Sequence, residues 1–218
     1  MARIEDHILK NVRGKVGNVV IKVRNGKPYL AARPSKYTAS QKPEEIHKRN
    51  KFKVNAKFAK CIKEAGILYK VWDKEKAPAS NAYNKICKVN FNLCGPDRPT
   101  LKNVITPAGF DLPVVDIKSS PDNIKVELGE FKIGNSEKRL IIKLIVCFYE
   151  PKQNRNGYFE LRSIENLEPD WPMFIFKFND EERKLTKNYK NKTVYLAAVT
   201  ENEKGEIIRS SKTVTREF

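Results

Sequence analysis

Several lysine and arginine residues around one tyrosine are the side chains in this sequence that are best suited to binding a ligand. They lie between residues 22 and 33 of the 218-residue chain. Basic side chains contact phosphate groups, and an aromatic ring among them stacks on a base or a sugar. This combination predicts the binding of nucleic acid or another polyanion. The candidate contacts are Lys22, Arg24, Lys27, Tyr29 and Arg33.

A β-hairpin is expected to position these side chains. Asn25-Gly26 favours a two-residue type I′ turn, because both central residues of that turn need a positive φ. A two-residue loop determines the register, and residues that oppose each other share a face of the hairpin. The expected pairs are Arg24 with Lys27, Val23 with Pro28, Lys22 with Tyr29 and Ile21 with Leu30.

This register predicts one basic face and one apolar face for the hairpin. The basic face carries the candidate phosphate contacts. The apolar face cannot remain in water and must meet either the protein's own core or another chain. The residues predicted for that interface are Val19, Ile21, Val23 and Leu30.

A long helix is expected next, over about residues 43–65, with Gly66 as an interruption. Proline suits its first turn, and the two glutamates that follow favour the positive end of the helix dipole. At 100° per residue, the apolar side chains, including Phe52 and Phe58, gather on one broad face. A narrower opposite strip is basic and would extend the polyanion-binding surface. Its members are Arg49, Lys53, Lys57 and Lys60.

The second half of the chain has the pattern of short strands and turns. A short helix over 81–88 and a Gly/Pro-rich boundary at 95–99 precede it. About seven strands with little helix between them predict an immunoglobulin-like or fibronectin-like antiparallel β-sandwich. The fold class is thus α+β, mainly β, with a basic hairpin–helix module over 1–98 and a β-sandwich domain over 99–218. The expected strands are 112–118, 124–128, 139–149, 158–163, 173–178, 193–200 and 206–215.

The charge distribution points to the same region. Residues 1–99 carry 23 Lys and Arg against 8 Asp and Glu, whereas residues 100–218 carry 20 against 18, so the first part holds +15 of the total charge of +17. If the lysines served only to keep the surface soluble, acidic residues would be expected among them in both halves of the chain. The alternative interpretation is that these lysines solvate the outer faces and protect a hairpin edge from aggregation.

Residues suited to catalysis or metal binding are scarce. The two histidines, His7 and His47, and the four cysteines lack the spacing of a metal site. GxSxG, Walker A, GxGxxG and HExxH motifs are missing from the sequence. Adjacent acids such as Glu181-Glu182 are expected to be solvated. The sequence therefore predicts a protein that is not an enzyme and has no cofactor or metal.

Two other functions remain open from the residues. The apolar hairpin face, the long helix and the sandwich would suit a self-assembling structural subunit of a particle, virion or filament, whose basic face contacts protein. A carbohydrate-binding sandwich would use Trp171, Tyr158 and Tyr149 as exposed platforms. The N-terminus lacks the pattern of a secretory signal and no apolar run is long enough to cross a bilayer, which predicts a cytoplasmic or particle-associated protein.

Several short motifs resemble a Bacteroidetes protein family of unknown function. They are the opening Gly14-Lys15-Val16-Gly17-Asn18, the later Asn25-Gly26-Lys27 and Arg33-Pro34, the Gln41, Arg49, Phe52 and Ala56 spacing, and the terminal hairpin with Val194-Tyr195-Leu196-Ala197, Gly205 and Ser210-Ser211. Lys42-Pro43-Glu44 replaces the small-residue run usual in that family. The resemblance covers most of the chain. It implies the architecture above and a function outside the classical enzyme classes.

Overall fold

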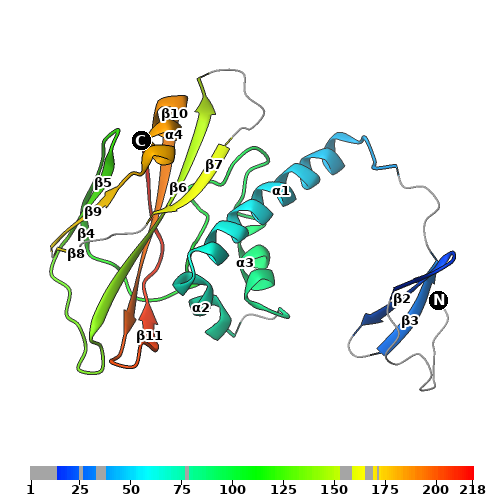
Figure 1. Ribbon diagram of the computed structural model, residues 1–218, viewed down its shortest axis with the longest axis horizontal. Coiled ribbons are helices and arrows are strands. Elements are labelled where there is room, and N and C mark those ends of the chain that lie inside the picture. Colours follow the sequence, from blue (N-terminus) through cyan, green and yellow to red (C-terminus); the bar gives the residue numbers. More distant parts are fainter. Residues whose placement is uncertain are drawn as a thin grey trace. The chain divides into compact units, whose positions relative to one another are not determined.

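The computed structural model describes residues 14–24, 27–32, 38–76, 79–152, 159–164, 169–170 and 172–218 (Figure 1). The chain divides into two compact units, residues 1–42 and residues 43–218. The sheets of both units are antiparallel, and the protein has a mixed α+β fold that is mainly β.

The smaller unit contains a three-stranded antiparallel sheet. Its strands, in the order β1-β2-β3, are β1 (Gly14–Val16), β2 (Val19–Arg24) and β3 (Lys27–Ala32). The expected register is confirmed, since Arg24 lies opposite Lys27 and Lys22 lies opposite Tyr29. Strand β1 is an addition that the sequence pattern did not predict. It pairs with β2 across a turn in which Gly17 has a φ of 57°, a conformation that favours glycine.

Three helices open the larger unit: α1 (Pro43–Glu64), α2 (Ile67–Lys74) and α3 (Ala82–Asn90). The expected ends of α1 are confirmed to within a residue. Gly66, with a φ of 64°, separates α1 from α2. A side-chain cap begins α3, where the Asn81 side chain accepts a hydrogen bond of 2.9 Å from the Asn84 backbone N–H.

Two antiparallel sheets follow the helices. The larger has the order β11-β10-β6-β7, with β12 also paired to β10, and the smaller has the order β4-β5-β9-β8. A fourth helix, α4 (Asp180–Asn188), lies between β9 and β10 in the chain. The strands are β4 (Val114–Ser119), β5 (Asn123–Leu128), β6 (Arg139–Pro151), β7 (Phe159–Ile164), β8 (Pro169–Asp170), β9 (Met173–Lys177), β10 (Tyr189–Glu201), β11 (Ile207–Ser210) and β12 (Val214–Glu217).

The larger sheet is buried on both faces. Alternate residues of β6 and β10, such as Leu144 and Leu196, join a core cluster with strands of the smaller sheet. The residues between them, such as Ile145 and Tyr195, join a second cluster with the three helices. Figure 1 shows the helices on one side of β6, β7 and β10 and the strands β4, β5 and β9 on the other. Burial on both faces explains why β6 and β10 read as nearly continuous apolar runs.

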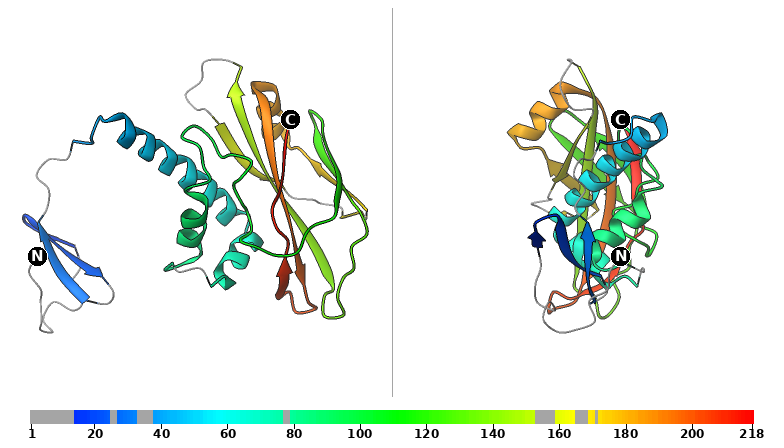
Figure 2. Two further views of the ribbon diagram at one scale, coloured as in Figure 1. Left: turned by 180° about the vertical axis from the view of Figure 1, so that it is seen from behind. Right: turned by 90° about the vertical axis from the view of Figure 1, so that its right-hand side faces the viewer.

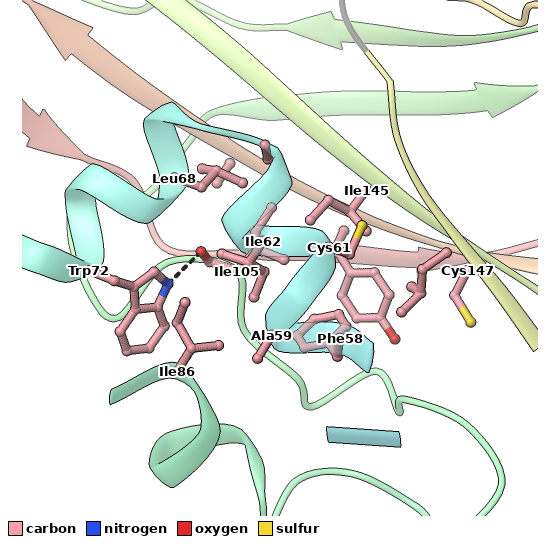
Figure 3. Close-up of a cluster of buried hydrophobic side chains, with 14 of the residues drawn as sticks. Phe58, Ala59, Cys61, Ile62, Leu68, Trp72, Ile86, Ile105, Ile145 and Cys147 are labelled. Atoms are coloured by element: carbon pink, nitrogen blue, oxygen red, sulfur yellow. Dashed lines mark hydrogen bonds between the residues drawn. The ribbon is translucent and has the colours of Figure 1, made fainter. Parts of the chain in front are cut away.

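The helix–sheet cluster explains why the helices belong with the strands. Figure 3 shows Phe58 and Cys61 on the side of α1 that faces Ile145 and Cys147 of the sheet. It also shows the indole Nε1 of Trp72 donating to the Ile105 carbonyl oxygen, at 2.9 Å. These side chains would be exposed without the sheet. The division expected between residues 98 and 99 therefore differs from the one observed, in which the larger unit begins at Pro43.

Helix α4 corrects the expectation that Glu181-Glu182 is a solvated acidic pair. Glu182 is buried, and its carboxylate accepts a hydrogen bond of 2.8 Å from the Asn179 backbone N–H. In return the Asn179 side chain accepts one of 2.9 Å from the Glu182 backbone N–H. This reciprocal capping box begins the helix and accounts for the burial of one acid, while Glu181 stays exposed.

Candidate polyanion-binding surfaces

The N-terminal sheet presents part of the predicted basic face. Lys22 is exposed and lies directly opposite Tyr29, which is half-buried. The strand positions of Arg24 and Lys27 pair with each other, and their side chains lie outside the described part of the chain, as does the whole of Arg33. The described pair places an exposed cation and an aromatic ring on one face of the sheet, an arrangement that suits contact with a phosphate and its base or sugar.

The opposite face of this sheet is apolar, as predicted. Ile21 is buried, whereas Val19 and Leu30 are half-buried. Val23, at the end of the face nearest the loop, is 37% exposed. Burial of this face is therefore greatest at Ile21, in the middle of β2, and lower toward both ends of the strand.

Lysine and arginine around this sheet are not balanced by acidic residues. Residues 7–43 contain nine lysines and arginines and not one aspartate or glutamate. Basic residues 13–36 of this segment are therefore at least seven residues from any aspartate or glutamate in the sequence. A segment with one sign of charge creates a field that attracts polyanions over a distance of about a Debye length.

The predicted basic strip of α1 is divided by the fold into two parts. Lys57 and Lys60, in the half of the helix that packs on the sheet, both have acidic partners. The Nζ of Lys57 lies 3.4 Å from a Glu160 carboxylate oxygen, and that of Lys60 lies 3.7 Å from Glu64. Lys57 also donates to the Phe159 carbonyl oxygen at 2.8 Å. Lys57 is therefore a structural contact between α1 and β7.

The first half of α1 differs from the second in having no buried side chain before Val54. Figures 1 and 2 show this half leading away from the sheet. Lys53 is exposed there and Arg49 is half-buried. Phe52, which the helical periodicity placed on the buried face, is 59% exposed. The prediction for Phe52 is wrong because, among the described residues, the packing of α1 on the sheet begins only at Val54.

Other lysines of the first half are used to terminate helices and join elements. Lys85 is only 9% exposed and donates to the carbonyl oxygens of Asp73 and Glu75 at the end of α2, at 2.9 and 2.5 Å. Lys74 donates to the Ile207 carbonyl oxygen at 2.8 Å. The sequence shows no sign of these roles, because each depends on a carbonyl group brought near by the fold. The net charge of the helices thus exceeds the charge available to a ligand.

The carbohydrate platforms predicted from the sequence lose one of their three members. Tyr149 is 3% exposed, and the guanidinium carbon of Arg98 lies 3.8 Å from the centre of its ring. Its hydroxyl group donates to Glu217, which also accepts from Arg98 at 3.2 Å. Tyr149 is therefore covered. Tyr158 and Trp171 lie outside the described residues.

The thiols are poor nucleophiles in this fold. Burial raises the pKa of Cys61 and of Cys147 to about 12 and that of Cys94 to about 11. A protonated thiol is neither a nucleophile nor a metal ligand.

Among the described residues, no group of three histidines, cysteines or acids is placed to hold a metal ion. No helix in the described part of the chain is long and apolar enough to cross a membrane.

Comparison with models of known protein families and with curated proteins finds no match for this chain. The proposals below accordingly rest on its own residues and their geometry.

Proposed function

We propose that this protein binds polyanions, in particular nucleic acid, without sequence-specific readout and without catalysing a reaction. The observation that carries the proposal is the acid-free segment 7–43, whose described residues include a sheet with an exposed Lys22 opposite Tyr29. The exposed first half of α1 is the second surface. Each of the two surfaces can contact phosphates by itself, so the proposal does not depend on how the units are placed.

The physical basis of such binding is the release of counterions. Each lysine or arginine that neutralises a phosphate releases condensed cations, and the affinity falls as salt rises. A binder of this kind needs accessible basic side chains more than it needs a preformed groove. Sequence-specific recognition would need side chains held against base edges by a reader element, and the chain contains no motif of that type.

The first experiment measures binding of labelled mixed-sequence DNA and RNA across a salt series by fluorescence anisotropy, with protein stripped of co-purifying nucleic acid. We expect a log–log slope that corresponds to several released counterions. Charge reversal of the sheet by Lys22→Glu with Arg24→Glu should lower the affinity by about tenfold or more and reduce the slope by about two.

A matched control comes from the nearly neutral second half. Lys118 and Lys125 are exposed and lie opposite each other on β4 and β5, like Lys22 and Tyr29 on the first sheet. Lys118→Glu with Lys125→Glu introduces the same change of charge and should alter binding much less. Equal losses in the two double variants would mean that only net charge matters. Unchanged affinity in a folded Lys22→Glu, Arg24→Glu variant would exclude the sheet as a contact.

A structural role in an assembly is the second candidate, supported by the apolar face of the N-terminal sheet. Val23 is 37% exposed on that face, and a copy of the chain could cover it. Sedimentation at increasing concentration tests this role, because self-association changes the mass and polyanion binding alone does not. The two roles are compatible in a protein that lines a nucleic-acid-containing particle.

We also propose that the two larger sheets form an immunoglobulin-like sandwich. Support comes from the strand orders β4-β5-β9-β8 and β11-β10-β6-β7, which match the orders A-B-E-D and G-F-C-C′ of that architecture. The helices cover the outer face of the second sheet, so a ligand is not expected on that face. This coverage favours the N-terminal sheet and α1 as the binding surfaces.

A further inference from the structure

Phe52 is an aromatic side chain that the packing of the described residues of the larger unit leaves exposed. Among the described residues it is the one phenylalanine that is classed as exposed, with 59% of its surface accessible. The neighbouring turns of α1 bury Phe58 completely, and they do so against the sheet. A phenylalanine in water forgoes the stabilisation that burial would bring. Its position therefore suits contact with something other than the protein's own core.

The surroundings of Phe52 are basic. Residues 48–53 read Lys-Arg-Asn-Lys-Phe-Lys, with four positive charges and no acid. Lys48 and Arg49 precede Phe52 by four and three residues, so they lie on its side of the helix. Lys48 is paired with Glu45 at 2.9 Å, and the two side chains are 63% and 45% exposed. Such a solvent-exposed pair is weak and can be exchanged for a phosphate contact.

A second aromatic group lies close to the same segment. The Nζ of Lys51 is 5.4 Å from the centre of the Phe91 ring, and Phe91 is half-buried at the end of α3. Lys51 and Lys53 flank Phe52 directly in the sequence. The exposed half of α1 thus combines cations with an accessible aromatic face, which is the composition of surfaces that bind single-stranded nucleic acid.

We propose that Phe52 stacks on an unpaired base of a single-stranded nucleic acid while the basic residues of 48–53 contact its phosphates. This inference rests on the polyanion binding proposed above and specifies its ligand class. Bases in a duplex already stack on each other, so their faces are not accessible to a side chain on a helix surface. The consequence is a preference for single strands over duplexes of the same sequence.

The test compares Phe52 variants in the full chain. Phe52→Ala removes the ring, Phe52→Leu keeps an apolar side chain without an aromatic face, and Phe52→Trp keeps and enlarges that face. All three should fold, because the position is exposed and helical. Ile46→Ala is the matched control, since Ile46 is an exposed apolar residue of the same half-helix, 37% accessible.

We expect Phe52→Ala and Phe52→Leu to weaken binding of a single-stranded oligonucleotide by about tenfold, while Phe52→Trp and Ile46→Ala leave it nearly unchanged. The salt slope should be the same in all of them, because no charge is removed. Binding of the duplex and of polyglutamate, a polyanion without bases, should not respond to Phe52. Phe52→Trp should also show quenching of its added fluorescence by the single strand, beyond any quenching seen in the parent.

The outcomes separate this inference from the proposed function. Nucleic-acid binding that is equally strong in all Phe52 variants overturns the stacking role and leaves polyanion binding in place. Equal losses for polyglutamate and the oligonucleotide also overturn it, because polyglutamate offers no base; a contact with acidic protein then becomes the better explanation. Absence of binding to any nucleic acid by the parent protein at low salt overturns both proposals.

Discussion

Lys57 and Phe159 are joined by two contacts between the long helix and strand β7. The Lys57 Nζ donates to the Phe159 carbonyl oxygen at 2.8 Å and lies 4.6 Å from the centre of the Phe159 ring. The ion pair with Glu160 adds a third partner for the same ammonium group. A lysine that appears in the sequence as part of a phosphate-binding strip therefore holds α1 against the sheet.

Because Lys57 contacts β7 and Lys53 is exposed, substitution of these two lysines of α1 should have opposite effects on stability and on binding. Lys57→Ala should lower the free energy of unfolding by about 1 kcal/mol, through loss of the hydrogen bond and the cation–π contact, and change nucleic-acid affinity little. Lys53→Ala should leave stability nearly unchanged and weaken binding with a smaller salt slope. Urea denaturation and salt-dependent anisotropy measure the two properties. A larger loss of affinity in Lys57→Ala than in Lys53→Ala would contradict the assignment.

The ion pair of Glu137 and Arg209 predicts a loss of stability in acid. Glu137 is 5% exposed, and it accepts hydrogen bonds from the Arg209 guanidinium, the Gly134 N–H and the Thr200 hydroxyl. The hydrogen bonds from Arg209 have the largest effect among the contacts that lower the Glu137 pKa from 4.5 to about 2, whereas burial of the carboxylate acts to raise it. Since the folded pKa is lower than the unfolded one, this stabilisation is present above about pH 4.5 and is lost as the pH falls toward 2.

Removal of the charge should reproduce the acid effect at neutral pH. Glu137→Gln is expected to lower stability by about 1 to 2 kcal/mol, a modest value because Arg209 stays 40% exposed. It should also flatten the stability profile between pH 4.5 and 2. Glu203→Gln, at an exposed ion pair with Lys138, is the control and should do neither. A Glu137→Gln variant with the parent's acid profile would show that another group controls it.

Burial of both faces of the larger sheet predicts which fragments fold. A fragment of residues 43–218 keeps the helices and should be soluble and cooperative. A fragment of residues 99–218 exposes Ile145, Tyr195 and Val199, which the helices otherwise bury, and should aggregate or lose fixed structure. Size-exclusion chromatography and thermal unfolding by circular dichroism compare them. A monomeric, cooperatively unfolding 99–218 fragment would support the domain division first expected from the sequence.

The different burial of the four thiols predicts the order of cysteine labelling. Cys61, Cys94 and Cys147 are buried, whereas Cys87 is half-buried. Near neutral pH, Ellman's reagent should label Cys87 first in the native protein and reach the other three only as it unfolds, because the thiolate is the reactive form. All four should react at once in denaturant. Rapid labelling of all four in the native state would show that the helix layer opens readily.

Short-range chemistry made several elements predictable. The Asn25-Gly26 signal predicted the register of β2 and β3, because a two-residue loop leaves one pairing. Proline and glycine predicted the two ends of α1, since each acts on the backbone at its own position. Short apolar segments separated by turn residues predicted most strands of the second half. Helix α4 was missed because its capping box, Asn179 with Glu182, stands in a sequence too polar to show an apolar face.

The sequence by itself determined local conformation and the asymmetry of charge, because both depend on residues that are neighbours along the chain. Only the tertiary structure decided which charges and aromatic groups are available. Phe52 and Phe58 belong to one helix, yet the sheet lies beneath Phe58 alone. Lys53 and Lys57 are one helical turn apart, yet only Lys57 meets the carbonyl group of β7. Burial and pairing depend on the element that lies opposite, and that element comes from a distant part of the chain.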